Sequence, residues 1–457
     1  MSDGFWTLDR VAHALDTRTI AAPPHGARSL GRVSTDTRTI RSGDIFVALV
    51  GDRFDAHDFL AGAVAAGARA LVVSRDVTAA DLGVPIYLVD DTLLALGDLA
   101  RFQRMVWGGT VIAVAGSNGK TSTKELLRAA LESRLSVHAT TGNLNNRIGV
   151  PLTLLALPAD ADVAVIEVGT SIPGEIAMLR DIARPDIAIV TSIAEEHLEG
   201  FGDIAGVLRE ESSVFHGVAV AIVPSDDTEL AEAAEAAVSA GRIVRAGLDD
   251  GDVRATSWRL ESDGTGTVVV NGAAIHSPMR GVHNLRNLML AIAAAREVGV
   301  VAADAGLGIA RLTPPPMRAN WQRIGKALVI NDAYNSNPGS ALAAIEMLTS
   351  APGMQKVAVL GTMLELGENS DRCHDSVARA ALASPASFVA GLGEFAAALK
   401  RLAPGDQRVV VGAGVDELWS ALEPHLKCDA TILLKASRGA KLERILPHIT
   451  SWANRDC

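Results

Sequence analysis

The chain has 457 residues, of which 53 are acidic and 42 are basic, so its formal net charge is −11. Hydrophobic residues make up 48% and charged residues 21%, which excludes a disordered or low-complexity chain. An acidic chain is poorly suited to nucleic acid, because neutralising phosphates requires clustered Lys and Arg. No apolar run approaches the roughly 18 residues that span a membrane, so we expect no stable membrane insertion.

The length predicts about three domains at roughly 150 residues each. Two breaks in composition divide the chain. Trp-Gly-Gly-Thr at 107–110 separates a helical stretch from a strand-like run, and Thr-Pro-Pro-Pro-Met-Arg at 313–318 cannot continue a helix or a central strand. We therefore predict domains at 1–106, 107–312 and 313–457.

The first domain alternates expected strands at 45–49, 70–73 and 86–89 with helices at 57–66 and 92–106. The middle domain has apolar runs typical of buried parallel strands at 110–115, 163–166, 187–191 and 218–223, then an expected antiparallel pair at 253–260 and 267–270. In the third domain, strands at 327–330, 357–360, 388–390, 408–411 and 431–434 alternate with five helical stretches. This pattern predicts an α/β fold with a doubly wound sheet in the third domain.

The strongest motif is Gly-Ser-Asn-Gly-Lys-Thr at 116–121, between an expected strand and an expected helix. Small residues let backbone N–H groups surround a phosphate at a helix N-terminus, where the helix dipole favours anions. Lys120 would reach the β- and γ-phosphates of ATP, and the Thr121 hydroxyl would bind Mg²⁺. Val114 stands where the full P-loop pattern has its outer glycine. The predicted loop comprises Gly116, Ser117, Asn118, Gly119, Lys120, Thr121 and Ser122.

Three further polar residues follow expected strands: Glu167, His197 and Asp332. A doubly wound sheet places its ligand beyond the carboxyl ends of its strands, so these side chains are expected near the phosphate loop. Each one alone would be interpreted as a solvated or capping residue. Oxygen donors with one imidazole suit a hard cation, so together they favour a Mg²⁺ ion carried with ATP.

A second glycine motif points to a different cofactor. Gly-Leu-Gly-Glu-Phe-Ala at 391–396 fits the dinucleotide fingerprint after a strand, and Asp416 follows twenty positions further on. That strand is the third of its domain, whereas the fingerprint normally follows the first. We therefore interpret Gly391 and Gly393 as helix–strand packing rather than NAD binding.

The three cysteines, Cys373, Cys428 and Cys457, form no CxxC or Cys/His cluster, which argues against structural zinc. No basic segment followed by an apolar core opens the sequence, so no secretory signal is expected. We expect reduced thiols in a cytoplasmic protein. No heptad seam or other assembly signal is evident, so the sequence leaves the oligomeric state open, with a monomer as the expectation.

Further motifs extend along nearly the whole chain. They are Ser-Thr-Asp-Thr-Arg at 34–38, the run 43–49, Arg-Phe-Asp-Ala-His at 53–57, Thr-Gly-Asn-Leu-Asn-Asn at 141–146, Gly-Val-Pro at 149–151, His-Asn-Leu-Arg-Asn at 283–287, Arg318, Asp-Ala-Tyr-Asn at 332–335, Leu-Glu-Leu-Gly-Glu at 364–368 and Lys-Ala-Ser-Arg-Gly at 435–439. In this order, the set resembles the Mur ligase family of peptidoglycan synthesis.

The resemblance implies a three-domain architecture with three binding functions. The uridine nucleotide would contact Ser34, Thr35, Asp36 and Arg38, and the muramoyl peptide would contact Asn143, Asn145 and Asn146. ATP would contact His283, Asn284, Asn287, Arg318, Asp332 and Asn335, in addition to the phosphate loop. The incoming substrate would contact Lys435, Ser437 and Arg438.

The resemblance also implies ATP-dependent amide formation. The sequence lacks a DNPR-like motif and resembles the members that add D-alanyl-D-alanine to UDP-N-acetylmuramoyl-tripeptide. The tripeptide carboxylate would attack the γ-phosphate, and the dipeptide amine would then displace phosphate from the acyl phosphate. Lys120 and Mg²⁺ would neutralise the anions, with Thr121, Glu167, His197 and Glu211 as metal ligands. The predicted catalytic residues are Lys120, Glu167, His197 and Glu211.

Three positions depart from the family pattern. Most members have a lysine, carbamylated by CO₂, where this sequence has Glu211, and a glutamate where it has Ser213. We hypothesise that Glu211 supplies the negative oxygen ligand directly. The alternative is that Glu211 is a surface helix residue beside Glu210 and that the metal site is weaker or rearranged. Thr362 stands where the family often has Asp, which affects the second-substrate details.

Two other functions stay open. A folylpolyglutamate-type ligase shares the ATP machinery, but it would give the motif at 34–38 no role. A Mur-like protein that binds nucleotide without ligating would be consistent with the missing lysine.

Overall fold

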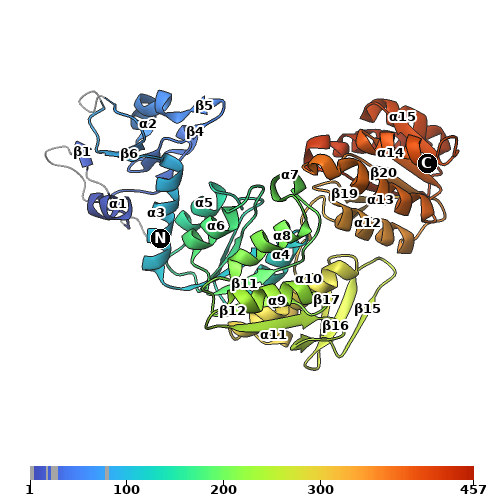
Figure 1. The fold of residues 1–457 in the computed structure, drawn as a ribbon, viewed down its shortest axis with the longest axis horizontal. Coiled ribbons are helices and arrows are strands. Elements are labelled where there is room, and N and C mark those ends of the chain that lie inside the picture. The colour runs from blue at the N-terminus through green and yellow to red at the C-terminus, as the bar shows by residue number, and fades with distance from the viewer. Residues whose placement is uncertain (1–4, 17–18, 22–28, 78–81, 457) are drawn as a thin grey trace. The chain divides into compact units, whose positions relative to one another are not determined.

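The computed structural model describes residues 5–16, 19–21, 29–77 and 82–456. The chain forms two compact units, drawn in Figure 1. The first comprises Met1–Ala113, Leu135–Thr170 and Glu175–Asp186, and the second comprises Val114–Arg134, Ser171–Gly174 and Ile187–Cys457. The strand β8 (Thr110–Ala115) passes from the first unit into the second. None of the helices in these ranges is long and apolar enough to cross a membrane.

The first unit contains a five-stranded sheet in the order β1-β7-β6-β3-β2. The strands are β1 (Thr19–Ala21), β2 (Val33–Ser34), β3 (Ile45–Val47), β6 (Ala70–Val73) and β7 (Ile86–Leu88). All are parallel except β1, which is antiparallel to β7. Successive side chains of a strand bury opposite faces, so Ile45 and Val47 enter one core and Phe46 enters the other.

Helices cover both faces of this sheet. They are α1 (Leu8–Ala14), α2 (Leu60–Ala66) and α3 (Thr92–Trp107), with the 3-10 turns η1 (Thr37–Thr39) and η2 (Ala56–Phe59) and the hairpin β4 (Val50–Gly51) and β5 (Phe54–Asp55). Asp91 caps the start of α3, and Gly108, with a φ of 70°, ends it. The expected break at 107–110 therefore coincides with a helix terminus.

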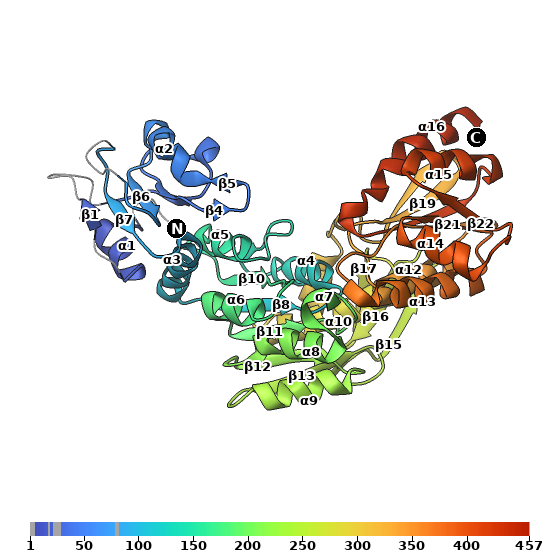
Figure 2. The ribbon, with the colours of Figure 1, turned by 45° about the horizontal axis from the view of Figure 1, so that its top comes forward.

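The remainder of the first unit packs against α3. Helices α5 (Gly149–Leu155) and α6 (Glu175–Ala183) contact α3, as Figures 1 and 2 show. The strands β9 (Val137–Ala139) and β10 (Val163–Glu167) pair in parallel. Since β10 is buried throughout and ends at Glu167, it places a carboxylate at a strand terminus, as the sequence predicts.

The second unit begins with the helix α4 (Lys120–Leu131) and four parallel strands. They are β11 (Ile187–Val190), β12 (Val220–Pro224), β13 (Arg242–Gly247) and β14 (Val253–Arg254). The helices here are α7 (Leu198–Phe201), α8 (Ile204–Ser212), α9 (Thr228–Ala237), α10 (Val282–Glu297) and α11 (Ala302–Ile309), with the turn η4 (Ser213–Phe215). α10 and α11 pack against α4.

A small antiparallel sheet of β15 (Ser257–Leu260), β16 (Gly266–Val270) and β17 (Ala273–Ser277) follows. The expected single strand at 253–260 is therefore wrong, because this segment leaves one sheet at Arg254 and enters another at Ser257. No Gly or Pro marks the change, so local composition contained no signal for it.

The C-terminal part of the second unit is a six-stranded sheet in the order β18-β19-β23-β20-β21-β22. Its strands are β18 (Asn320–Ile324), β19 (Ala327–Asp332), β20 (Lys356–Leu360), β21 (Phe388–Leu392), β22 (Val409–Gly412) and β23 (Thr431–Lys435). All pair in parallel except β18, an antiparallel edge strand that sequence analysis missed. Its polar residues give it no buried-strand signal.

Helices cover both faces of this sheet, as Figure 2 shows. α12 (Pro338–Ser350), α13 (Ser370–Ala383) and α14 (Glu394–Leu402) pack on one face, and α15 (Val415–Leu422) and α16 (Leu446–Asp456) pack on the other. The turns η5 (Gly367–Asn369), η6 (Glu423–His425), η7 (Arg438–Ala440) and η8 (Leu442–Ile445) connect them. The doubly wound sheet with five helices is confirmed.

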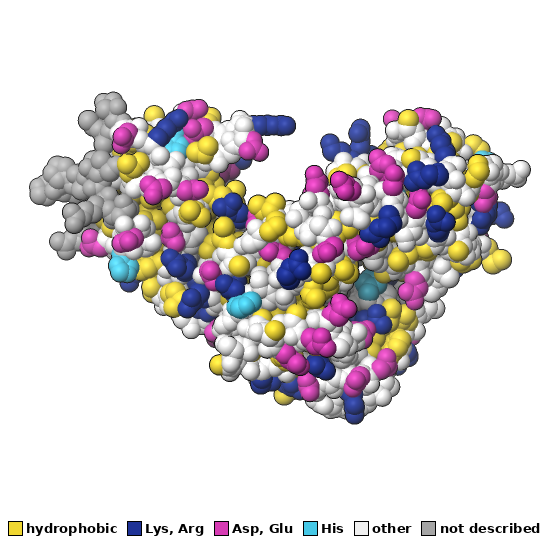
Figure 3. All heavy atoms as spheres, in the orientation of Figure 1, with side chains coloured by type: hydrophobic (Ala, Val, Ile, Leu, Met, Phe, Trp, Pro, Cys, Tyr) yellow, Lys and Arg dark blue, Asp and Glu magenta, His cyan; other side chains and the backbone are white. Residues whose placement is uncertain are grey.

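Two further observations concern the surface charges and the cysteines. On the face drawn in Figure 3, acidic and basic side chains are interspersed rather than gathered by sign, so an anionic ligand must be met by individual groups. Among the described cysteines, Cys373 is a free, buried thiol, as expected. Cys457 lies outside the described residues.

Candidate functional site

The phosphate loop lies between the end of β8 and the start of α4, as predicted. Gly116 has a φ of 115°, and a Cβ there would lie 2.5 Å from Thr191 Oγ1. Gly119 has a φ of 89°, and a Cβ there would lie 2.6 Å from Asn287 Oδ1. Both positions therefore require glycine for its backbone conformation and for space.

The loop is held by the residues that follow β11. Ser192 O accepts the N–H of Ser117 at 2.8 Å, and the Thr191 hydroxyl donates to Asn118 O at 2.5 Å. On its other side, α10 packs against α4 and brings Asn287, with its partner Asn284, beside Gly119. The predicted phosphate loop and these two predicted ATP residues are thus neighbours in one unit.

Lys120 points back into the loop, where its ammonium contacts the carbonyl oxygens of Gly116 and Ser117. Glu196 lies 3.8 Å from the ammonium and is itself only 5% exposed. Burial raises the pKa of Glu196, while Lys120 and hydrogen bonds from Ser117 and Asn337 oppose the rise. A buried acid thus faces the lysine that would bind phosphate.

Glu211 lies on α8 and is 1% exposed, so the alternative of a surface residue is wrong. Its Oε2 accepts the N–H of Gly116 at 2.7 Å, which joins it directly to the phosphate loop. Burial raises its pKa to about 7, although Lys120 opposes the rise. The neighbouring Glu210 accepts the N–H of Gly174 instead, at 2.8 Å.

His197 has a left-handed backbone, with a φ of 49°, and its Nδ1 contacts the carboxylate of Glu365. Glu365 also has a left-handed backbone, with a φ of 64°. Burial opposes protonation of His197, but the hydrogen bond to Glu365 and the charge of Glu196 outweigh it and raise the histidine pKa. Two non-glycine residues in this conformation meet at one contact, which is typical of a functional site.

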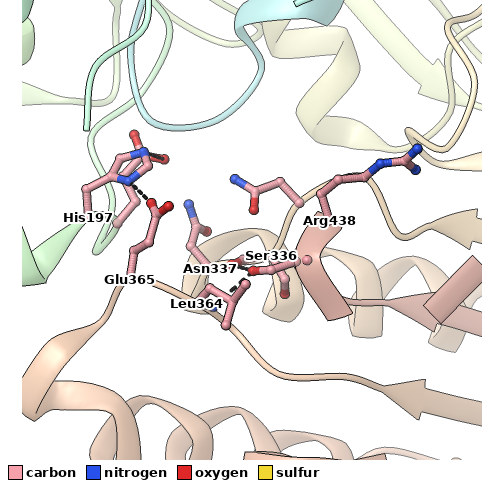
Figure 4. Close-up of a pocket in the computed structure, with 10 residues that line it drawn as sticks. His197, Ser336, Asn337, Leu364, Glu365 and Arg438 are labelled. Atoms are coloured by element: carbon pink, nitrogen blue, oxygen red, sulfur yellow. Dashed lines mark hydrogen bonds and ion pairs between the residues drawn. The ribbon is translucent and has the colours of Figure 1, made fainter. Parts of the chain in front are cut away.

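A polar pocket of about 160 Å³ opens beside this contact. It is lined by Glu196, His197, Asn335, Ser336, Asn337, Leu364, Glu365, Ser437, Arg438 and Gly439. Figure 4 shows the His197–Glu365 pair at one side and Arg438 at the other, with Ser336 and Asn337 between them. The Ser336 hydroxyl is buried and has no hydrogen-bond partner among the described residues. The polar groups that line the pocket suit a small polar group.

Asp332 ends β19 and forms an ion pair with Lys435 at 2.7 Å. Lys435 is 3% exposed and also donates to Asn335 O at 2.8 Å. The predicted residues Asp332, Asn335 and Lys435 are therefore brought together. Asp332 is committed to this lysine, which corrects the interpretation of it as one of three metal-directed residues. The guanidinium of Arg318 stacks over Tyr334, 4.1 Å from its ring centre.

Other predicted residues hold local structure. His283 is adjacent to Asn284, whose amide lies 3.2 Å from the ring nitrogen Nε2, and burial lowers the pKa of His283. The Ser437 hydroxyl donates to Ser336 O at 3.2 Å and accepts the N–H of Leu364 at 3.0 Å. Arg438 lies 3.3 Å from Glu443.

In the first unit, the structure joins two residues that were predicted for different roles. The amide of Asn145 donates to Glu167 Oε1 at 2.9 Å, and Glu167 is 1% exposed. Asn146 Oδ1 accepts the N–H of Gly149 at 2.9 Å and so shapes the turn into α5, while Asn143 is exposed. The predicted muramoyl-peptide loop thus positions the predicted carboxylate.

The other predicted residues of the first unit cluster at η1. Asp36 accepts the N–H and the guanidinium of Arg38, which lowers its pKa to about 2. The hydroxyl of Ser34 lies 3.3 Å from the N–H of Asp36, and Thr35 lies between them in sequence. Arg38 remains accessible despite this pair, because its side chain is 85% exposed.

A Mg²⁺ ion is predicted to bind four residues: Thr121, Glu167, His197 and Glu211. In the part of the chain that the structure describes, no three His, Cys, Asp or Glu side chains are arranged as a metal site. Within the second unit, Thr121 and Glu211 are buried oxygen donors at 6% and 1% exposure, and oxygen donors are the ligands that suit a hard cation. His197 makes its contact with Glu365 instead.

The structure supports the packing interpretation of the second glycine motif. A Cβ at Gly391 would lie 2.7 Å from Leu399, and one at Gly393 would lie 2.1 Å from Thr362 Oγ1. That hydroxyl also accepts the N–H of Glu394 at 3.2 Å, at the start of α14. Since Thr362 occupies the helix N-terminus, the position where a pyrophosphate would bind is filled.

Sequence reasoning missed three residues of the pocket: Glu196, Ser336 and Asn337. Asn337 caps α12 and also donates to the phosphate-loop residue Asn118 at 2.9 Å. The available signals were weak: Glu196 directly precedes a predicted ligand, and Asn337 precedes a proline that begins a helix. The 219-residue separation between Asn118 and Asn337 hides their contact from sequence patterns.

The fold and the site together define an α/β nucleotide-binding protein with a phosphate loop and a second, doubly wound sheet. Three family descriptions match successive parts of the chain: "Mur ligase family, catalytic domain" at 30–104, "Mur ligase middle domain" at 114–295 and "Mur ligase, glutamate ligase domain" at 317–438. The chain belongs to the Mur ligase family.

Relatives match nearly its whole length. The UDP-N-acetylmuramoyl-tripeptide–D-alanyl-D-alanine ligase of Escherichia coli (strain K12) is 37% identical over 92% of this chain and 93% of its own. The enzyme of the same name from Bacillus subtilis (strain 168) is 36% identical over 94% and 95%.

Solved structures also match nearly the whole chain. MurF from Acinetobacter baumannii superposes with a TM-score of 0.89 at 31% identity, covering 98% of this chain and 99% of that one. MurF from Thermotoga maritima, in complex with ADP, has a TM-score of 0.82 at 28% identity and covers 93% and 98%. A folylpolyglutamate synthase from Mycobacterium tuberculosis, at 19% identity and a TM-score of 0.64, shares the fold and covers only 78% of this chain.

Proposed function

We propose that this protein joins D-alanyl-D-alanine to UDP-N-acetylmuramoyl-tripeptide in an ATP-dependent, ADP-forming reaction of peptidoglycan synthesis. The near-full-length similarity to ligases of that name supports the substrates. The observation that carries the proposal is the phosphate loop beside a small polar pocket, with Asn337 in contact with both. An enzyme that activates a carboxylate with ATP and then admits an amine needs these two sites together.

The chemistry follows from the groups present. The tripeptide carboxylate attacks the γ-phosphorus and releases ADP, which gives an acyl phosphate. The dipeptide amine attacks the acyl carbon, loses a proton and expels inorganic phosphate. Lys120 moves from the loop carbonyls to the phosphates, where its charge stabilises the negative charge of both steps. The pocket side chains hold the amine in place, so positioning rather than a protein nucleophile accounts for most of the rate.

We assign Mg²⁺ to Thr121, Glu167, Glu211 and His197. The ion supplies charge neutralisation for the phosphates. Glu211 contributes a carboxylate at the position where the family usually has a carbamylated lysine, and His197 must exchange its contact with Glu365 for this role.

The remaining assignments follow the same scheme. Domains at 1–106, 107–312 and 313–457 would hold the nucleotide sugar, ATP and the dipeptide. Ser34, Thr35, Asp36 and Arg38 would contact the uridine nucleotide, and Asn143, Asn145 and Asn146 the muramoyl peptide. Ser122, His283, Asn284, Asn287, Arg318, Asp332 and Asn335 would complete the ATP site, and Lys435, Ser437 and Arg438 the dipeptide site. The enzyme would act as a monomer in the cytoplasm, where ATP is supplied.

Phosphate release from ATP tests the reaction. The purified protein receives UDP-N-acetylmuramoyl-tripeptide with D-alanyl-D-alanine, or either one alone. We expect sustained release only with both substrates, together with formation of the pentapeptide product by mass spectrometry. Intact ATP binding without release would favour the alternative of a non-ligating nucleotide-binding protein. Release with a folate and glutamate would favour the folylpolyglutamate alternative, which only the shared fold supports.

A pair of neighbouring acids tests the metal assignment. In Glu211→Gln we expect turnover to fall at least tenfold and the Mg²⁺ concentration for half-maximal rate to rise. Glu210→Gln is the matched control, because Glu210 is also buried but contacts Gly174. Binding of Mn²⁺ with ATP, measured by electron paramagnetic resonance, gives a readout independent of turnover. Equal, small effects of both variants would contradict the assignment.

A further inference from the structure

A buried histidine outside all the assigned residues contacts the loop that forms one wall of the pocket. His374 lies on α13 and has no exposed surface. Its Nε2 accepts the N–H of Met363 at 2.9 Å, and its Nδ1 lies 2.8 Å from Ser370 O. The ring also packs edge-on against Phe395, with 4.7 Å between ring centres. Both nitrogens and the ring itself therefore make contacts.

These partners determine the protonation state of the ring. A carbonyl oxygen only accepts, so Nδ1 carries the hydrogen that is donated to Ser370 O. A backbone N–H only donates, so Nε2 must be unprotonated to receive Met363. Burial lowers the pKa of His374 and so favours this neutral form, although Glu394, Asp371 and Asp375 oppose the effect. The contact is thus one that only a neutral imidazole can make.

The histidine is the first of three successive anchors in the loop after β20. Met363 is held by His374, the N–H of Leu364 is held by Ser437 Oγ at 3.0 Å, and Glu365 contacts His197. Leu364 and Glu365 both line the pocket, as Figure 4 shows. Because Glu365 has a φ of 64°, its conformation must be imposed by its neighbours. Met363 is buried, and the two residues that follow it, Leu364 and Glu365, line the pocket.

We propose that His374 is a positioning residue that sets the Leu364–Glu365 wall of the pocket and thereby controls binding of the incoming dipeptide. The proposal rests on the proposed function for the identity of that substrate. It assigns no contact between His374 and the substrate. The effect passes through the Met363 N–H and the backbone of the two residues that follow it.

Two substitutions separate the hydrogen bond from the packing. His374→Leu keeps an apolar group against Phe395 but leaves the Met363 N–H without its acceptor. His374→Gln keeps an acceptor near the position of Nε2. We expect His374→Leu to raise the KM for D-alanyl-D-alanine at least tenfold and to change the KM for ATP less than twofold. In His374→Gln we expect the KM for D-alanyl-D-alanine to return most of the way to the wild-type value. His425→Leu is the control, since His425 is exposed and its ring contacts Phe388 of the same sheet, with 5.1 Å between ring centres.

Hydrogen exchange provides a readout that does not depend on turnover. In His374→Leu we expect faster exchange in peptides that cover 361–366 and unchanged exchange in peptides that cover the phosphate loop. A parallel rise of all three substrate KM values, or faster exchange throughout the C-terminal sheet, would mean a general structural role and would overturn the proposal. Unchanged exchange at 361–366 would also overturn it. Absence of ligation by the wild-type protein would instead refute the proposed function, because the exchange result is obtained without substrates.

Discussion

Glu211 is a carboxyl group in the protein interior, and the direction of its pKa shift has a consequence for stability. The folded-state pKa of about 7 lies above the ordinary value of 4.5. At pH values below 4.5 the carboxyl group is protonated in the folded and in the unfolded state. Its stabilising contribution to the free energy of unfolding is therefore fully present there. The contribution is lost as the pH rises to 7, because the folded state then carries a buried charge.

Glu211→Gln changes the free energy of unfolding of the ligand-free protein. We therefore expect this change to be more stabilising at pH 8 than at pH 5, by about 1–3 kcal/mol. The amide is neutral at both pH values and can still accept the Gly116 N–H. Urea unfolding at a series of pH values measures the difference. Glu210→Gln serves as the control, and parallel pH curves for wild type and Glu211→Gln would contradict the expectation.

Gly119 shows why a phosphate loop depends on single residues. Its φ of 89° and the 2.6 Å approach of Asn287 both exclude a side chain. We expect Gly119→Ala to weaken ATP binding at least tenfold, since either the loop or Asn287 must shift. Gly272→Ala is the matched control, with a φ of 79° and no atom within 4 Å of the added Cβ. It should cost about 1 kcal/mol of stability and leave ATP binding unchanged, as measured by calorimetric titration.

At the scale of elements, helix termini explain much of the site. α4 begins at the phosphate loop with Gly119 as its N-cap residue, which has no side chain to cap the helix. α12 is closed by Asn337 and Ser340 in a capping box, and α14 is closed from another loop by Thr362. These different ends agree with the assignment of phosphate binding to the first glycine motif and of helix–strand packing to the second.

The Thr362 contact can be tested by an isosteric change. We expect Thr362→Val to destabilise the protein by about 1 kcal/mol, because the N–H of Glu394 loses its acceptor at the start of α14. Thr349→Val should be nearly neutral, since the Thr349 hydroxyl only bonds back to Ile345 O within α12. Denaturant unfolding monitored by circular dichroism measures both. An unchanged midpoint for Thr362→Val would exclude a capping role.

For the whole molecule, the net charge is −11, so the proposed polyanionic substrates must be met by individual basic groups. On the face drawn in Figure 3, acidic and basic side chains are interspersed. Lys120 is the cation of the phosphate loop, and buried acids surround it: Glu196 faces its ammonium and Glu211 contacts its loop. An anionic ligand bound to Lys120 would compete with these contacts. Ligand binding and stability should therefore be strongly linked.

Excess ADP with Mg²⁺ should raise the free energy of unfolding by about 2.7 kcal/mol at 100 times its Kd, because it binds only the folded loop. Differential scanning calorimetry with and without the ligand measures the shift. In Lys120→Ala we expect the shift to fall to near zero at the same ligand concentration. An equal shift in wild type and variant would show that binding does not use this lysine.

The sequence by itself determined the α/β class, the phosphate loop and the order of the main strands, because these depend on local periodicity and on glycines at fixed spacing. It also identified Glu211 as the unusual position. Only the tertiary structure decided that Glu211 is buried against Gly116 and that Asp332 is paired with Lys435. The structure showed that Glu196 and Asn337 line the pocket and that His374 contacts Met363 in the adjacent loop. It also showed that residues 253–260 divide between two sheets and that Asn320–Ile324 adds an edge strand. Each of these depends on burial or on contacts between distant residues, and neither is encoded in the residue types of a local window.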